Sequence, residues 1–340
     1  MEKFDVIIIG AGPAGLSCAK ELSNSNKKVL LLEKNNIIGP KVCAGGITNH
    51  DLEQLKLPKE LLDKRYKQII IHTPFHKDII KQDKPFVYTI DRETLGQWQL
   101  KNIKTDNIII KTESRVTEIN NNYIVVDNKK IKFKYLVGAD GSSSSVRRFL
   151  KLKSNRKGIA IQYIIPTKKY KKIEMFFDSK LFGSGYAWIF PHKSYVSIGC
   201  GCDPKVLSSK KVINNFNKWL KSNKIDVSKG KYEANPINFD YQGYKFKNIF
   251  LTGDAAGLAS GLTGEGIYQA LISGEEIAKI ILDKKYKSTK MDELIRSKNM
   301  HNKVLNFLEK SGPIRKIEYE LLGLLLKSKW IDKKIINTFI

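Results

Sequence analysis

The sequence predicts an α/β protein in which a Rossmann-type nucleotide-binding domain is interrupted by an antiparallel β-sheet domain and followed by a helical C-terminal tail. Three observations predict this fold class. A Gly-rich loop follows a short apolar run near the N-terminus, and a long central stretch has strand-like rather than helical patterning. A second Gly-rich segment then follows another apolar run, about 240 residues after the first.

The first fifty residues have the pattern of a βαβ unit. Residues 4–9 are apolar and rich in β-branched side chains, which suits a strand buried on both faces of a parallel sheet. Residues 16–22 have helical spacing, and residues 29–32 form a second buried strand. Glu33 ends that strand, at the distance from the loop where an acid accepts hydrogen bonds from a ribose diol.

The loop Gly10-Ala-Gly12-Pro-Ala14-Gly15 predicts a phosphate site. Gly10 permits the tight turn, Gly12 lets the backbone approach a phosphate, and Gly15 lets helix and strand pack closely. The helix N-terminus supplies free N–H groups and a partial positive charge. A dinucleotide is therefore expected to bind here.

The next elements are predicted from local patterns. Residues 51–91 suggest a short helix and strands, including strands at 68–72 and 85–90. Asp91 is a plausible N-cap for a helix with Leu95, Trp98 and Ile103 at apolar positions. Residues 107–137 resemble a β-meander that ends in a hairpin of strands 123–126 and 131–137.

Residues 155–245 predict an antiparallel sheet that covers a pocket. The expected strands are 159–165, 172–177, 186–190 and 195–199, with one helix at about 208–222. The chain then returns to the first domain through a buried strand at 249–251, and residues 290–340 are helical and basic. The predicted division is a discontinuous FAD-binding domain (1–65, 92–154 and 246–285), a substrate-binding β domain (66–91 and 155–245) and a C-terminal helical region (286–340).

The cofactor follows from two distant motifs. Neither the first Gly loop nor Gly253-Asp254-Ala-Ala-Gly257 is specific alone. In this order, they indicate the two ends of one FAD site, with the first loop at the pyrophosphate and the second at the ribityl chain and flavin ring.

A third motif gives the chain a family resemblance. Residues 135–147 suggest a strand, an Asp140-Gly141 turn and a helix start. With the two Gly motifs, this series resembles the p-hydroxybenzoate-hydroxylase-type FAD superfamily over roughly residues 1–285. The resemblance implies that Asp254 bonds a ribityl hydroxyl and that Arg92 contacts the FAD phosphate or ribityl chain. Glu265, just before the last helix of that domain, is expected to face solvent or to cap the helix, and a role in proton relay is the other option.

Two further stretches resemble the geranylgeranyl reductase family. One is Lys41-Val-Cys43-Ala44-Gly45-Gly46, and the other is Tyr186-x-Trp188-x-Phe190-Pro191 followed by Gly199-x-Gly201. In that family the first lies by the flavin and the second lines a prenyl pocket. Period-2 geometry puts the three aromatic side chains on one strand face, a wall suited to an isoprenoid. The implied function is FAD-dependent reduction of isoprenoid C=C bonds on a prenyl lipid.

The predicted site has two parts. Tyr186, Trp188, Phe190, Pro191, Gly199 and Gly201 are expected to form the substrate pocket, and Cys43 and Tyr186 are the catalytic candidates. Cys43 is otherwise a buried small residue or one that shapes the flavin site. No metal ligands are expected. The expected cofactor contacts are Gly10, Gly12, Ala14, Gly15, Glu33, Lys34, Cys43, Ala44, Gly45, Arg92, Val116, Asp140, Gly141, Gly253, Asp254, Gly264, Gly266 and Ile267.

Alternatives stay open at this point. A flavin monooxygenase or halogenase, or a quinone-linked electron-transfer flavoprotein, would use the same scaffold. Gly261 stands where many superfamily members have proline, and 340 residues is compact for the family, which leaves the length of the substrate chain undetermined. The sequence has no second Gly-rich nucleotide motif, so the electron donor is either transiently docked NAD(P)H or a carrier such as ferredoxin.

Composition limits the binding partners and the cellular location that we expect for the protein. The net charge is +26, yet only eight of the 60 basic residues are arginine, so the charge is either a lysine coat or an attraction to an anionic membrane. No base-reading basic helix indicates nucleic-acid binding. The absence of a signal-peptide pattern and of an 18-residue apolar run predicts a cytoplasmic protein, with peripheral contact at the inner membrane face as an option. The lysine-interleaved apolar tail, which runs from Tyr319 to Trp330, predicts either an amphipathic surface helix or packing onto the protein's own pocket.

Overall fold

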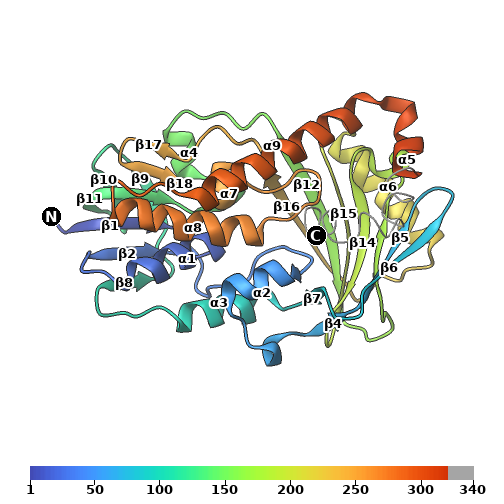
Figure 1. Cartoon of the computed structure of the whole chain (residues 1–340), viewed down its shortest axis with the longest axis horizontal. Helices are drawn as coiled ribbons and strands as arrows, with labels where there is room; N and C mark the ends of the chain where they lie inside the picture. The colour runs from blue at the N-terminus through green and yellow to red at the C-terminus, as the bar shows by residue number, and fades with distance from the viewer. Residues whose placement is uncertain (321–340) are drawn as a thin grey trace.

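The computed structural model describes residues 1–320, and two large sheets lie side by side in it (Figure 1). The sheet nearer the N-terminus has the strand order β17-β18-β11-β1-β2-β8. Strands β1 (Lys3–Ile9), β2 (Val29–Leu32), β8 (Ile108–Lys111), β11 (Lys129–Gly138) and β18 (Ile249–Leu251) run parallel there. β17 (Lys245–Phe246) is antiparallel to β18.

The predicted meander is only partly correct. β9 (Val116–Ile119) and β10 (Tyr123–Val126) do form an antiparallel ribbon with β11. The expected strand at its beginning, however, is β8, which pairs parallel with β2, and the second half of β11 pairs parallel with β1. Local patterns find the strands, but which strand they pair with depends on the helices that cross over between them.

Helices α1 (Pro13–Leu22) and α8 (Ile267–Leu282) pack tightly against each other, and their buried apolar side chains share one hydrophobic core with this sheet. Their backbones approach so closely that a Cβ on Gly274 would lie 2.1 Å from the carbonyl oxygen of Ala14. Ser17 Oγ donates a hydrogen bond to Leu271 O at 2.8 Å. The rigid helix pair fixes the Gly loop relative to the segment that precedes α8.

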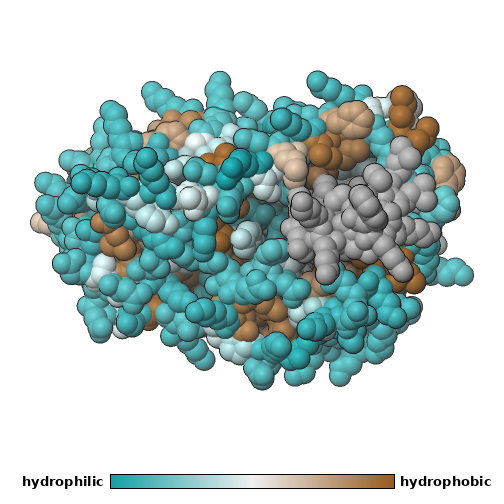
Figure 2. Space-filling view, in the orientation of Figure 1, coloured by the Kyte–Doolittle hydropathy of each residue, from teal (hydrophilic) through white to brown (hydrophobic). Residues whose placement is uncertain are grey.

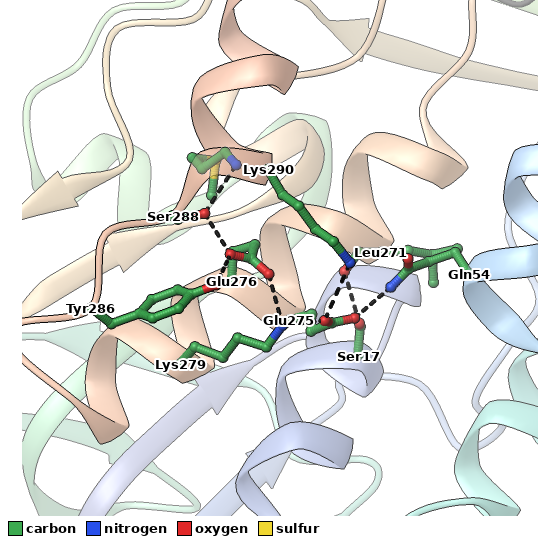
Figure 3. A network of polar contacts seen from close by, with 10 residues as sticks. Ser17, Gln54, Leu271, Glu275, Glu276, Lys279, Tyr286, Ser288 and Lys290 are labelled. Atoms are coloured by element: carbon green, nitrogen blue, oxygen red, sulfur yellow. Dashed lines mark hydrogen bonds and ion pairs between the residues drawn. The ribbon is translucent and has the colours of Figure 1, made fainter.

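A polar network holds α8 to its neighbours (Figure 3). Gln54 of α2 (Asn49–Leu55) donates to Glu275, while Lys279 contacts both Glu275 (2.5 Å) and Glu276 (2.9 Å). Glu276 also accepts from Tyr286 (2.8 Å) and Ser288 (2.5 Å), which immediately precede α9 (Thr289–Lys310). Burial alone would raise the pKa of Glu276, but these hydrogen bonds outweigh it and lower that pKa.

The second large sheet has the order β16-β12-β15-β14-β13-β5-β6. It joins β5 (Gln68–His72) and β6 (Lys77–Lys81) to β12 (Lys157–Ile165), β13 (Ile173–Phe176), β14 (Tyr186–Pro191), β15 (Val196–Cys202) and β16 (Lys231–Asn238). The sheet is mixed rather than wholly antiparallel as predicted, because β13 pairs parallel with β5. The helix predicted at about 208–222 is α6 (Ser209–Ser222), which packs against this sheet together with the short α5 (Ser179–Phe182).

A small third sheet connects the two large ones. It contains β3 (Gly46–Thr48), β7 (Val87–Thr89) and β4 (Lys64–Tyr66), so it takes strands from both sides of the domain boundary predicted at residue 65. α3 (Arg92–Lys101) follows, and Asp91 Oδ1 accepts from Thr94 N at 3.0 Å, which confirms the predicted N-cap. Ile103 lies beyond the end of α3 rather than within it.

Short elements complete the chain: η1 (Lys59–Leu61), η2 (Gly141–Ser143), α4 (Ser145–Phe149), α7 (Gly253–Ala256) and η3 (Gly312–Ile314). α9 runs from α8 to the second sheet (Figure 1). Within residues 1–320, no helix combines the length and apolar character needed to span a bilayer. The predicted apolar tail lies outside the described residues, except for Tyr319, which is buried and donates to Gly183 O at 3.1 Å.

Candidate active site

A cavity of about 580 Å³ lies where the loops of the first sheet meet the face of the second. Its walls are mostly aliphatic and aromatic. One end is lined by the start of α1 and the segment before α8, and the opposite walls come from β5, β12, β14 and α9. Segments far apart in the sequence therefore share one largely apolar space.

The Gly loop borders this cavity, and its glycines have different surroundings. Gly10 has φ +100°, and a Cβ there would lie 2.5 Å from Ala139 O. A Cβ on Gly15 would lie 1.9 Å from Gly10 O, whereas one on Gly12 would meet nothing within 4 Å. Gly12 lines the cavity with Ala14 and is the N-cap of α1, so backbone N–H groups border an open space there.

Acidic side chains organise the same edge of the sheet. Glu33 Oε2 accepts from Ala11 N at 2.9 Å, which ties the end of β2 to the Gly loop. Asp254 lines the cavity and accepts from Lys41 Nζ and Ser142 Oγ, both at 3.0 Å. Asp140 Oδ2 accepts from Ser145 N at 2.6 Å. The second Gly motif is thus bonded to the 41–46 loop and to the Asp140-Gly141 turn.

The surroundings of Arg92 indicate that the site fits an anionic ligand. It is the first residue of α3, it is buried, and it lines the cavity. Its Nε has no hydrogen-bond partner anywhere in the described part of the chain. A buried guanidinium N–H without an acceptor is costly, and a phosphate or ribityl oxygen would supply one. Together with the open space at Gly12, this arrangement fits a dinucleotide.

The aromatic strand β14 forms another wall. Tyr186, Trp188 and Phe190 all line the cavity, and the Tyr186 and Trp188 rings meet edge to face, 6.2 Å between centroids. In the β14–β15 register, Tyr186 lies opposite Gly201 and Trp188 opposite Gly199. A Cβ on Gly199 would lie 2.4 Å from the Trp188 ring. The Trp188 ring therefore explains why residue 199 is glycine.

Several predicted site residues lie outside the cavity lining. Pro191 O instead accepts from Tyr66 OH (2.7 Å) and Thr89 Oγ1 (3.0 Å), which joins β14 to the small sheet. Gly199 is covered by Trp188. The other predicted residues that do not line the cavity are Gly10, Gly15, Glu33, Lys34, Gly45, Val116, Asp140 and Gly253.

The 41–46 loop is held by buried groups that the sequence analysis missed. His192 Nδ1 pairs with Asp63 at 2.7 Å and its Nε2 contacts Ala44 O at 2.9 Å, while a Cβ on Gly45 would meet the imidazole at 2.4 Å. Gln162 Nε2 donates to Cys43 O at 3.3 Å. Both residues lie more than 100 positions from the loop, so no local pattern signals the contacts.

Glu265 differs from its predicted placement. It lines the cavity instead of facing solvent, and its Oε2 accepts from Gln269 Nε2 at 3.0 Å. Burial raises the pKa of its carboxyl, and the charge of Asp51 raises it further. Asp51, on α2, lines the same cavity, and burial raises its pKa as well. Glu265 is half-buried, and it lies between Gly264 and Gly266, which also line the cavity.

Comparison with known proteins agrees with this geometry. The family model described as pyridine nucleotide-disulphide oxidoreductase matches residues 4–146. A digeranylgeranylglycerophospholipid reductase 3 from Methanosphaera stadtmanae is 30% identical over 330 residues, spanning 86% of this chain and 82% of that relative. A solved geranylgeranyl bacteriochlorophyll reductase-like protein from Thermoplasma acidophilum has a TM-score of 0.79 at 21% identity, over 97% of this chain and 92% of that one.

The fold is also shared with p-nitrophenol 4-monooxygenase from Pseudomonas putida (TM-score 0.73, 17% identity, 100% of this chain and 98% of that one). Fold and site together define an FAD-dependent oxidoreductase, which binds FAD as its cofactor. The chain belongs to the geranylgeranyl reductase family, because the Methanosphaera stadtmanae reductase is 30% identical to it over most of the length of both proteins.

Proposed function

We propose that this protein saturates C=C bonds in the isoprenoid chains of a prenyl lipid of the digeranylgeranylglycerophospholipid type. The observation that carries the proposal is the single cavity in which the Gly loop and the segment before α8 face the aromatic strand β14. Apolar pockets with few polar groups suit apolar ligands. The names of the relatives support the same substrate class.

The proposed cofactor contacts are the set predicted from the sequence, with Gly12, Arg92 and Asp254 as the principal ones. Reduced FAD, when bound, supplies hydride to one alkene carbon. The protein's part is to orient the chain and to exclude water. An unactivated alkene accepts hydride poorly, so positioning must supply much of the rate. Cys43 and Tyr186, which both line the cavity, would flank the reacting bond.

The substrate and electron partners are part of the proposal. A nicotinamide nucleotide or an acidic carrier such as ferredoxin would reduce the flavin, and a basic surface suits both. A lipid substrate also calls for contact with a membrane. Figure 2 shows apolar surface at the upper right, over the end of α9. Two groups of exposed apolar residues would make this membrane contact: Phe307, Ile314 and Ile317 near the end of α9, and Phe75 and Ile79 on the β5–β6 hairpin. Peripheral contact at the cytoplasmic face would follow.

The test is anaerobic incubation of the dithionite-reduced, FAD-loaded protein with geranylgeranyl lipids, followed by mass spectrometry. We expect gains of two hydrogens for each saturated bond. If prenyl lipids gain no hydrogen while oxygen-dependent products form in air, the protein is instead a monooxygenase or halogenase. Reduction of a quinone without change in the lipid would favour electron transfer.

A further inference from the structure

We propose that Glu265, supported by Asp51, donates the proton that completes reduction of the alkene. This inference rests on the proposed function. Hydride addition to a C=C bond leaves the second carbon in need of a proton, so the site requires an acid at the cavity wall. Glu265 lies in that wall between Gly264 and Gly266, in the segment that leads into α8.

Glu265 and Asp51 have different hydrogen-bond partners. Asp51 Oδ2 accepts from Thr48 N (2.8 Å) and Thr48 Oγ1 (3.1 Å), which fixes the carboxylate in the capping box of α2. Asp51 Oδ1 is buried and has no hydrogen-bond partner among residues 1–320. Glu265 is bonded through its side chain to Gln269 on the following helical turn. Glu265 is therefore the less constrained of the two carboxyls, and Asp51 has an oxygen with unused hydrogen-bonding capacity.

The surroundings keep a proton on this pair. The charge of Asp51 raises the pKa of Glu265, and two carboxyls that interact in this way do not both ionise readily but titrate as a unit. The hydrogen bonds from Thr48 act in the opposite direction by lowering the pKa of Asp51, and the electrostatic effects of His50 on α2 and Arg92 on α3 add to them. Two tyrosines also interact electrostatically with these carboxyls. Glu265 and Asp51 raise the pKa of Tyr268 on α8, and Glu265 raises the pKa of Tyr186 on β14. Burial outweighs these lowering effects on Asp51 and the hydrogen bond from Gln269 on Glu265, so the pKa of each carboxyl stays above its usual value.

The other possible proton donors in the cavity, Tyr186 and Cys43, are less suited to donate a proton to the substrate. The Tyr186 hydroxyl already donates to Thr263 O at 2.5 Å, and burial raises its pKa, so its proton is held away from substrate. Cys43 Sγ accepts from Gly45 N at 3.4 Å. A buried carboxylic acid with a raised pKa is closest to the ideal for general acid catalysis near neutral pH.

The step balances as follows. One alkene carbon gains hydride, which carries both electrons given up by the reduced flavin. The other carbon gains H⁺ from Glu265 as the π bond breaks and two C–H bonds form. Glu265 is left as a carboxylate and recovers a proton from solvent before the next turnover. In this scheme Glu265 is the catalytic residue, and Asp51 acts through its charge, which raises the pKa of Glu265.

The experiment compares Glu265→Gln, Glu265→Asp and Glu53→Gln in the FAD-loaded protein. Glu53→Gln is the matched control, since it removes an exposed carboxylate from α2, outside the cavity. We expect Glu265→Gln to retain FAD and to be reduced by dithionite like wild type, but to transfer hydrogen to geranylgeranyl lipid at least about 100-fold more slowly in single turnover. Glu265→Asp should be intermediate, and wild-type rates should fall as pH rises through the pKa of the pair.

A second readout needs no catalysis. The infrared carbonyl band of a protonated carboxylic acid should be present in wild-type apoprotein at neutral pH, disappear at alkaline pH, and be absent or shifted in Glu265→Gln. If Glu265→Gln reduces lipid at the wild-type rate, or if the apoprotein shows no such band, the assignment is overturned. If wild type itself reduces no prenyl lipid, the proposed function fails, and the infrared band still reports whether the pair holds a proton.

Discussion

Gly12 and Gly15 both belong to the nucleotide loop, yet a methyl group at each has a different consequence. At Gly15 the added Cβ would lie 1.9 Å from Gly10 O, so helix and loop must separate. At Gly12 it would enter empty space in the cavity. We expect Gly15→Ala to destabilise the apoprotein by about 1–3 kcal/mol.

Gly12→Ala should leave apoprotein stability within about 0.5 kcal/mol of wild type while weakening FAD binding. Thermal unfolding of both apoproteins, followed by flavin titration, separates the two effects. Wild-type FAD affinity in Gly12→Ala would show that the pyrophosphate does not approach this position.

Gly199 limits the position of the Trp188 ring in the same way. A Cβ there would lie 2.4 Å from the indole and 2.5 Å from Ile161 O. Gly199→Ala should therefore displace the ring, cost about 1–3 kcal/mol and slow lipid reduction, with FAD still bound. Gly201→Ala is the comparison, since its nearest contact would be 3.3 Å away. Equal stability of the two variants, measured by chemical denaturation, would contradict this account of Gly199.

At the scale of elements, α9 holds the segment that follows the second Gly motif. Lys298 Nζ donates to Ala259 O at 2.7 Å, and His301 Nδ1 bonds Ser260 Oγ at 3.0 Å. Near its end, the helix is joined to β12 through Arg156, which contacts Glu309 at 2.8 Å and 3.0 Å. The helix therefore links the flavin segment to the substrate sheet.

Lys298 gives this link a pH dependence. Burial, helped by the charge of Arg156, lowers the pKa of the Lys298 ammonium to about 7, against the opposing charges of Asp240 and Asp254. The unfolded chain keeps its proton up to the ordinary lysine value of about 10.4. Between these two pH values the unfolded state binds more protons, so wild-type stability should rise with pH.

Lys298→Met should lose that rise and be the more stable protein at neutral pH, because a buried cation is replaced by an apolar side chain of similar length. Chemical denaturation at pH values from 7 to 10 measures both trends. Lys303→Met, at an exposed position on the same helix, should keep the wild-type dependence. If Lys298→Met and wild type show parallel curves, Lys298 is not titrating in this range.

Apolar elements were predictable from sequence, and polar contacts between distant elements were not. The strands at 29–32, 68–72 and 249–251 have the predicted ends because each is a short run of buried side chains. β16 was missed because an edge strand with Lys231, Glu233 and Asn235 lacks that pattern. His192, Gln162 and Glu265 were missed or misplaced because their burial depends on how the sheets meet.

The whole molecule carries a net charge of +26 and exposes apolar side chains near the cavity. Phe75 and Phe307 are each 65% exposed, and Phe307 also lines the cavity. Lys316 Nζ lies 3.8 Å from the centre of the Phe75 ring, so a cation adjoins this apolar surface. Exposed aromatic residues beside lysines suit the interface of an anionic membrane, where each nearby cation contributes about 1 kcal/mol.

We therefore expect the protein to sediment with anionic vesicles at low salt and to be released as salt screens the lysines over a Debye length of about 10 Å at 0.1 M. Phe75→Ser and Phe307→Ser should each weaken vesicle binding at constant salt, since less apolar area enters the interface. Ile109→Ser is the matched control, because Ile109 is 40% exposed on β8 of the other large sheet. Equal weakening by Ile109→Ser would mean that charge alone, without a defined apolar face, draws the protein to the vesicle. Binding to neutral vesicles as strong as to anionic ones would instead remove the role of the lysines.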